Sequence, residues 1–279
     1  MKKDIADIAK SKAAKIVENR IIRSFCIVEK SSFSVRNLIN QITNLKIEIL
    51  YFMKIKLLII VLSAFIFQAC PPRVKPISTY ENLRFENEIR AFEQQDKQNG
   101  IDKKEILFVG SSSIRMWTTL EEDMQPYQVL NRGFGGATTN EVLQYYDRII
   151  KPYKPQIIVV YVGENDISEG GNPLETASLN EYLFDKIRHD FKKSKIVYIS
   201  MKPSIARWNL WEDFKKGNAK IKQLCDSNDA WTYVESADVM LHENGTIRKD
   251  IFIEDGLHMN AEGYELWTKI VKDVLDENS

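Results

Sequence analysis

The sequence predicts an α/β protein, a three-layer α/β/α sandwich with a five-stranded parallel sheet. From about residue 78 to the end, apolar segments of strand length alternate with amphipathic segments of helix length. The strand segments are nearly continuous apolar runs, which are typical of parallel strands covered on both faces. No internal repeat or low-complexity segment interrupts the alternation. We therefore expect one domain over residues 78–279.

Five apolar runs are predicted as strands, and five amphipathic segments as helices. The first helical segment carries apolar residues at helical spacing and ends at Gly100. Two later helices are expected to begin at capping boxes, formed by Thr138 with Glu141 and by Ser178 with Glu181. The predicted strands are 105–109, 128–130, 156–162, 195–201 and 231–234. The predicted helices are 81–98, 138–150, 178–192, 211–226 and 261–275.

The composition is that of an ordinary globular chain. The 279 residues are 44% hydrophobic and 28% charged, which excludes wholesale disorder and a membrane protein with many spans. The 39 basic and 39 acidic residues balance, which removes the general electrostatic argument for a nucleic-acid partner. Residues 1–56 hold 12 of the basic and 5 of the acidic side chains, so the predicted domain is mildly acidic. The three cysteines predict neither a disulfide framework nor a zinc site.

Residues 53–70 have the pattern of a secretory signal peptide. A methionine and two lysines precede a short apolar run that ends in a small residue and Cys70. The run is shorter than the ~20 apolar residues that a spanning helix needs. A cysteine at this point resembles a bacterial lipobox, in which it is lipidated, although Phe67 and Gln68 depart from the usual pattern. We expect a signal peptide over 53–69, lipidation at Cys70 and a tether over 70–77.

Residues 1–52 precede this signal and resemble no domain. A signal peptide belongs at the N-terminus, so the simplest interpretation is that translation begins at Met53 and that residues 1–52 come from an upstream start. The alternative is a genuine cytoplasmic extension followed by a signal anchor. Because a lipobox implies a bacterium, the expected location is the cell envelope. The domain would then be anchored to the membrane by lipid and would face the periplasm or the exterior.

Polar or glycine-rich segments follow the predicted strands on one edge of the sheet. They cover residues 110–114 after the first strand, 131–136 after the second, 163–166 after the third and 255–258 beyond the fifth. Ligands bind outside the carboxyl ends of the strands in such sheets. Taken singly, each segment is most often a helix cap, a turn or a solvated loop. Their joint occurrence in this order predicts a functional site.

Four landmarks in these segments resemble the SGNH hydrolases, also called the GDSL esterase and lipase family. They are a Ser in a Gly-Asp-Ser-like motif, a Gly, an Asn in a Gly-x-Asn-Asp motif and a His in an Asp-x-x-His motif. The chain departs from the family at Ser111, where Asp is usual. The resemblance covers about residue 106 to the end, and it implies a flavodoxin-like sheet and ester hydrolysis. The matching residues are Gly110, Ser112 and Trp117, then Asn131 and Gly136, then Gly163, Asn165 and Asp166, and last Asp255 and His258.

These residue types fit nucleophilic catalysis on an ester. A serine hydroxyl needs an adjacent base, and we predict Ser112 as the nucleophile and His258 as its base. Asp255 can accept a hydrogen bond from the imidazole and fix its tautomer. The resemblance implies that the oxyanion is bound by the Ser112 and Gly136 N–H groups and by the side chain of Asn165. No metal and no cofactor are expected.

The segment after the fourth strand is predicted to contribute to the pocket. Pro203 stops the strand from continuing as a paired central strand, so the chain turns outward on the site's edge of the sheet. Trp208 is expected to line the substrate cleft and Trp211 to support it, although two tryptophans at this spacing are also typical of a helix core. Arg207 is suited to a phosphate or carboxylate group.

The leading prediction is a serine esterase at the cell envelope. The resemblance allows lysophospholipids, simple acyl esters and O-acetylated glycans as substrates. Two alternatives stay open: a non-catalytic lipoprotein that binds glycan, which Ser111 alone supports, and an O-acyltransferase that uses the same site. The expected partners are a small-molecule ester and, through the lipid anchor, the membrane, without nucleic acid. The oligomeric state is left open.

Overall fold

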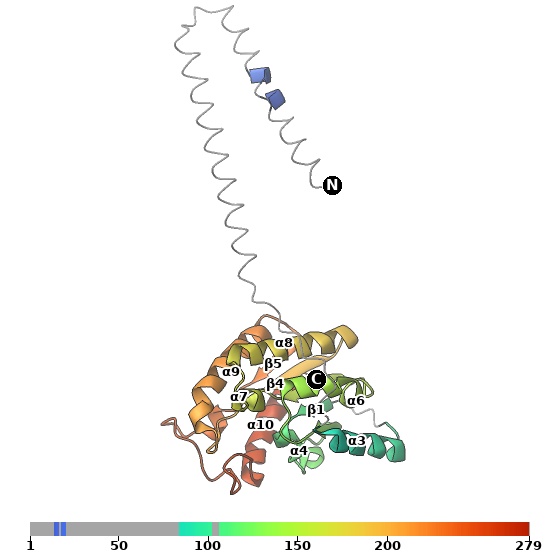
Figure 1. Cartoon of the computed structure of the whole chain (residues 1–279), viewed down its shortest axis with the longest axis vertical. Coiled ribbons are helices and arrows are strands. Elements are labelled where there is room, and N and C mark those ends of the chain that lie inside the picture. Colours follow the sequence, from blue (N-terminus) through green and yellow to red (C-terminus); the bar gives the residue numbers. More distant parts are fainter. Residues whose placement is uncertain (1–13, 17, 21–83, 102–105, 279) are drawn as a thin grey trace, which may run out of the picture. The chain divides into compact units, whose positions relative to one another are not determined.

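The computed structural model describes residues 14–16, 18–20, 84–101 and 106–278 of the chain (Figure 1). The chain divides into two compact units, residues 1–72 and 73–279. The described residues of the first unit are helical. None of the helices that the structure describes is long and apolar enough to cross a membrane.

The predicted signal peptide over 53–69, the lipidation site at Cys70 and the tether over 70–77 lie outside the described residues. The domain boundary at residue 78 and the interpretation of residues 1–52 therefore stay predictions. The fold and the site described below belong to the second unit alone.

A five-stranded sheet, parallel throughout, forms the centre of the second unit. Its strand order is β2-β1-β3-β4-β5, so the chain runs from β1 outward to β2 and then crosses to β3 on the other side of β1. The point between β1 and β3 is therefore the topological switch point, where ligands bind in doubly wound sheets. The strands are β1 (Ile106–Gly110), β2 (Val129–Gly133), β3 (Ile157–Tyr161), β4 (Lys195–Ile199) and β5 (Trp231–Val234).

Two hydrophobic cores cover opposite faces of this sheet, because alternate residues of a strand point to opposite faces. Leu107 and Val109 of β1 belong to one core, and Ile106 and Phe108 belong to the other. The first core is covered by α3 (Glu86–Asn99), α6 (Thr139–Ile149), α8 (Pro173–Asp190) and α9 (Trp211–Asp226), and the second by α4 (Ser112–Arg115), α5 (Leu120–Asp123) and α10 (Ala261–Asn278) (Figure 1). The predicted three-layer sandwich is confirmed.

Three short helices lie in the loops between these elements. They are α7 (Glu164–Ser168), η1 (Trp208–Leu210) and η2 (Asp238–Met240). Sequence patterns did not predict them, because a single helical turn has no periodicity to detect. α7 and η1 follow β3 and β4, so both lie at the carboxyl edge of the sheet.

The two predicted capping boxes have different outcomes. Thr138 and Glu141 form a complete capping box at the start of α6, as predicted. The second prediction is wrong, because α8 begins at Pro173 and Ser178 lies inside it. Asn172 caps this helix by accepting bonds from two backbone N–H groups, and the Ser178 hydroxyl donates to the carbonyl of Leu174 instead.

The second strand is longer than its apolar run predicts. β2 continues to Gly133, so Asn131 lies in the strand and not in the loop that follows it. The Asn131 side chain donates to the carbonyl of Ile114 at 2.7 Å and accepts from the Gly133 N–H at 2.9 Å. Asn131 therefore joins β2 to α4, which places its role beside the site and not within it.

Candidate active site

Ser112 begins α4, directly after the turn that ends β1. Gly110 has a φ of 142°, and a Cβ atom there would lie 1.9 Å from the carbonyl oxygen of Tyr161. Only glycine fits this turn. Ser111 and Ser113 are buried, at 3% and 2% exposure, whereas Ser112 is half-buried. Of the three serines, Ser112 is the one that the turn presents to the site.

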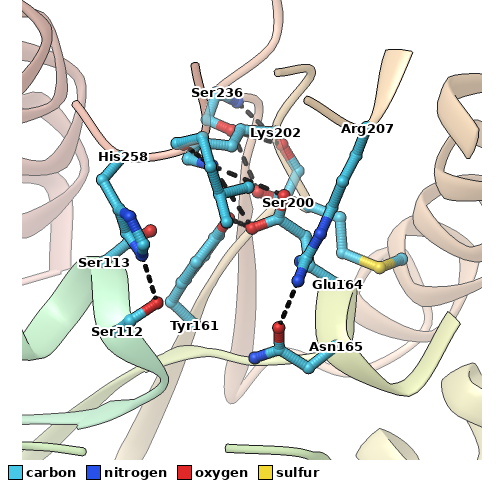
Figure 2. A network of polar contacts seen from close by, with 12 residues as sticks. Ser112, Ser113, Tyr161, Glu164, Asn165, Ser200, Lys202, Arg207, Ser236 and His258 are labelled. Carbon is cyan, nitrogen blue, oxygen red and sulfur yellow. Dashed lines mark hydrogen bonds and ion pairs between the residues drawn. The ribbon is translucent and has the colours of Figure 1, made fainter. Parts of the chain in front are cut away.

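The structure brings Ser112, His258 and Asp255 together in a continuous chain of hydrogen bonds. Nε2 of His258 lies 2.7 Å from Oγ of Ser112 (Figure 2), and its Nδ1 lies 2.5 Å from Oδ2 of Asp255. With the ring proton on Nδ1, the imidazole donates to Asp255 and accepts from the serine hydroxyl. Ser112 and His258 are 146 positions apart in the chain. Together with Asp255, they have the geometry of a nucleophile, a base and an orienting carboxylate.

The Asp255 carboxylate is held in its charged form. Burial opposes that form, but the hydrogen bonds from the His258 ring and from the N–H groups of His258 and Leu257 outweigh it, so the pKa of Asp255 is lowered. A charged carboxylate favours the Nδ1–H tautomer of His258 and leaves Nε2 free to accept a proton.

The loop that carries Gly136 is joined to α7 by two side chains. Nδ2 of Asn165 donates to the carbonyl of Ala137 at 2.9 Å, and both carboxylate oxygens of Asp166 accept from the Thr139 N–H at 3.0 Å. Gly136 has a φ of 64°, in the left-handed region that glycine tolerates. These contacts set the Gly136 loop against Asn165, the two positions that the family resemblance assigns to oxyanion binding.

Asp166 also has a perturbed pKa. Its carboxyl group is deeply buried, and desolvation raises its pKa to about 6, although the hydrogen bonds from Thr139 act in the opposite direction. Asp166 contacts the first turn of α6 and not the Ser112 hydroxyl, so its titration concerns the stability of the loop.

The segment after β4 reaches the same edge of the sheet, as predicted from Pro203. The guanidinium of Arg207 donates to Oδ1 of Asn165 at 2.8 Å (Figure 2), and the Ala206 N–H donates to the carbonyl of Gly256 at 2.9 Å. Arg207 therefore contacts a protein amide in this structure. The role that the sequence suggests for it, binding a phosphate or carboxylate of the substrate, stays a prediction.

The two tryptophans of this segment lie in different environments. Trp208 is 41% exposed and does not belong to either core. Trp211 is 8% exposed and packs in the first core. The core interpretation therefore holds for Trp211 alone, and the role of Trp208 in the substrate cleft stays a prediction.

Two buried charged residues beside the site were not identified from the sequence. Lys202 is fully buried, and Glu164, the residue before Asn165, is 4% exposed. The only available signal was their position directly after apolar strands, where charged residues are also common in solvated loops. No group of three or more His, Cys, Asp or Glu side chains that could hold a metal ion is present among the described residues.

Residues 109–266, more than half of the chain, match the model of the GDSL-like Lipase/Acylhydrolase family. The chain belongs to this family. The sequence predicts an ester hydrolase of the GDSL type, and the family match confirms this enzyme class.

One curated relative and two solved structures illustrate the similarity. The chain is 31% identical over 120 residues to a multidomain esterase of Ruminococcus flavefaciens, and this match covers 42% of the chain and 15% of the relative. A candidate platelet activating factor from Streptococcus pneumoniae has a TM-score of 0.62 at 22% identity, covering 69% of this chain and 94% of that chain. An acetyl-xylooligosaccharide esterase of Geobacillus stearothermophilus has a TM-score of 0.50 at 14% identity, covering 61% and 94%. At these identities, the two structures establish the fold alone.

Proposed function

We propose that this chain is a serine esterase that cleaves a carboxylic ester through an acyl-enzyme. The observation that carries the proposal is the 2.7 Å contact between Oγ of Ser112 and Nε2 of His258, oriented by Asp255. Oγ attacks the ester carbonyl carbon while Nε2 takes the hydroxyl proton. The tetrahedral intermediate then expels the alcohol, which receives that proton. Water repeats the sequence, releasing the acid and restoring the serine hydroxyl.

The negative charge of the tetrahedral intermediate needs donors already in place. In the proposed mechanism, these are the backbone N–H groups of Ser112 and Gly136 and the Nδ2 amide group of Asn165. One Nδ2 hydrogen is directed to the carbonyl of Ala137, which leaves the other for the oxyanion. The Arg207 contact to Oδ1 supports this assignment, because an amide in the opposite orientation would present a second donor to the guanidinium.

The substrate class proposed first is an acetyl or other short acyl ester on a glycan. The supporting observations are the acetyl-xylooligosaccharide esterase among the similar structures and the exposed side chain of Trp208, next to Arg207 in the sequence. The multidomain esterase supports ester cleavage without naming a substrate. An exposed aromatic face suits a sugar ring. Lysophospholipids and simple acyl esters remain the competing substrates in an ester panel.

Fluorophosphonate labelling together with this panel tests the proposal. The full-length chain should be labelled at Ser112 and should hydrolyse p-nitrophenyl acetate and acetylated oligosaccharides. A protein that bound glycan without labelling or turnover would be the non-catalytic lipoprotein. Acetyl transfer to an added sugar in preference to water would identify the O-acyltransferase.

We also propose that the enzyme acts at the bacterial cell envelope, anchored by lipid on Cys70. The support is the signal-like segment over 53–69 and the cysteine that follows it. Fractionation of cells grown with labelled fatty acid tests the anchor, since the wild-type chain should carry label in the membrane fraction. A Cys70→Ser variant that still carried the label would contradict it. Peptides from residues 1–52 in the cellular protein would contradict translation from Met53.

A further inference from the structure

Lys202 is a fully buried lysine in the loop that follows β4. Its Nζ donates a 2.9 Å hydrogen bond to the carbonyl oxygen of Leu257 and lies 3.4 Å from each carboxylate oxygen of Glu164 (Figure 2). Leu257 precedes His258 in the chain, and Glu164 precedes Asn165. A single amino group thus contacts the immediate neighbours of both the proposed base and the proposed oxyanion donor.

This arrangement is costly as a means of stabilising the fold. Burial lowers the pKa of Lys202, while the charge of Glu164 acts in the opposite direction. Buried ion pairs can often be replaced by packed apolar residues without loss of stability. Stability alone is therefore a weak reason for the pair, and the contacts of the lysine indicate a second role.

The peptide unit between Leu257 and His258 is held at both ends. Its carbonyl oxygen accepts from Nζ of Lys202 at 2.9 Å, and its N–H donates to Oδ1 of Asp255 at 2.9 Å. A peptide unit is planar, so two bonds on opposite sides fix its orientation. This orientation sets the Cα of His258 and hence the direction in which the imidazole points towards Ser112.

Glu164 links the same lysine to the Ser112 turn. Its carboxylate accepts a hydrogen bond from the hydroxyl of Tyr161, which is fully buried in β3. The carbonyl of Tyr161 accepts from the N–H of Ser111 at 3.0 Å. Buried contacts therefore run from the serine turn through Tyr161 and Glu164 to Lys202. Lys202 in turn donates a hydrogen bond to the loop that carries His258.

We propose that Lys202 is a positioning residue that holds the base His258 in reach of Ser112, with Glu164 as its counter-ion. This inference rests on the proposed function. Lys202 touches neither the substrate nor the reacting atoms, so it acts on turnover and leaves substrate binding unchanged. Whether charged or neutral, its amine can donate to the Leu257 carbonyl, so the hydrogen bond matters more than the charge.

Three variants of the full-length chain separate the hydrogen bond from the charge. Lys202→Met removes both and leaves the Glu164 carboxylate buried without its cation. Glu164→Gln removes the counter-ion but keeps the donor to Leu257. The double variant Lys202→Met/Glu164→Gln removes both charges and still lacks the donor. Arg188→Met is the matched control, because Nη1 of Arg188 donates at 2.7 Å to the carbonyl of Ser194, which lies just before the opposite end of β4.

We expect Lys202→Met to lower kcat about 10²-fold with KM within about threefold of wild type, because a small displacement of a catalytic group is enough for such a loss. The double variant should recover melting temperature and keep the loss in kcat. Glu164→Gln should lose less than tenfold, and Arg188→Met should keep its kcat. Recovery of kcat in the double variant, within about threefold of wild type, would overturn the proposal.

Hydrogen–deuterium exchange tests the same inference without esterase activity. The N–H groups of Leu257 and His258 both donate to Asp255, and the Ile253 N–H donates to the carbonyl of His258, so the loop should exchange slowly in the wild type. Peptides over residues 251–260 should exchange faster than in the wild type in the double variant, and at the wild-type rate in Arg188→Met. Unchanged protection in the double variant overturns the inference. A wild type that neither turns over nor labels removes the proposed function, and the exchange result then decides the positioning role alone.

Discussion

The guanidinium of Arg207 donates a 2.8 Å hydrogen bond to Oδ1 of Asn165, and this contact fixes which side of the amide faces the candidate oxyanion site. Nδ2 of the same amide donates to the carbonyl of Ala137. Arginine is always charged, so it cannot accept from Nδ2, and only one amide orientation satisfies both partners. The segment after β4 therefore donates two hydrogen bonds to the site, one from Arg207 to Asn165, the proposed oxyanion donor, and one from Lys202 to Leu257, beside His258.

The first prediction concerns this contact. Arg207→Met should lower kcat about tenfold or more, since hydrogen bonds to charged groups contribute about 1.5–3 kcal/mol, and it should leave KM for a neutral ester nearly unchanged. In an Asn165→Ala background, which itself should lose on the order of 10²–10³ in kcat, the same change should have little further effect. Steady-state kinetics of the four proteins measures this coupling.

The competing result has a different signature. If Arg207 contacts the substrate directly, the Arg207→Met variant will raise KM for an anionic ester and leave kcat for a neutral ester intact. The effect would then persist in the Asn165→Ala background. Arg207→Lys keeps the charge without the planar fork and separates charge from geometry.

The second prediction identifies the nucleophile among three adjacent serines. Ser112→Ala should lower kcat by on the order of 10⁴–10⁶-fold and abolish fluorophosphonate labelling. Ser111→Ala and Ser113→Ala should retain measurable turnover, because both side chains are buried and His258 contacts Ser112. An inactive Ser111→Ala beside an active Ser112→Ala would show that the nucleophile is Ser111, one residue before the position that the family motif assigns.

The third prediction separates the two tryptophans. Trp208→Ala should raise KM for acetylated oligosaccharides several-fold with little loss of melting temperature, because the ring is 41% exposed. Trp211→Ala removes a core side chain and should cost about 3–5 kcal/mol of unfolding free energy. Kinetics and thermal melting of both variants provide the comparison. An unchanged KM in Trp208→Ala would remove this side chain from the substrate cleft.

The sheet and the residues that meet at its edge could be predicted because both depend on local patterns. The strands are buried on both faces, so each is an apolar run, and parallel strands bring the loops after them to one edge. Asp255 and His258 are three residues apart, and Ser112 lies two residues after Gly110, which ends a strand. Proximity in space follows from the topology once the strands are assigned.

Lys202 and Glu164 could not be predicted because their burial depends on how two separate loops pack. A charged residue after a strand is usually solvated, and nothing in the local sequence distinguishes these two. The start of α8 was misassigned for a different reason, because two local cap signals compete. Ser178 has the spacing of a cap, but Asn172 with Pro173 forms the stronger helix start six residues earlier.

The last prediction follows from the buried carboxyl of Asp166. Its pKa is about 6 in the folded chain, against about 3.9 for an unperturbed aspartate, so the folded state binds more protons between these values. The contribution of Asp166 to the free energy of unfolding is therefore most favourable at low pH. It falls by about 2–3 kcal/mol in total as pH rises from about 4 to about 6. Carboxyls with lowered pKa values, such as Asp255, have the opposite dependence, so the wild type alone cannot isolate the effect.

The comparison with Asp166→Asn isolates it. The amide oxygen of the variant can still accept from the Thr139 N–H, but the side chain no longer titrates. Urea unfolding of both proteins from pH 4 to pH 7 gives the difference in unfolding free energy. The variant should gain about 2–3 kcal/mol relative to wild type between pH 4 and pH 6, and nothing further above about pH 7. A difference that stayed constant over this range would show that Asp166 is ionised in the folded protein throughout, and that the hydrogen bonds from Thr139 outweigh its burial.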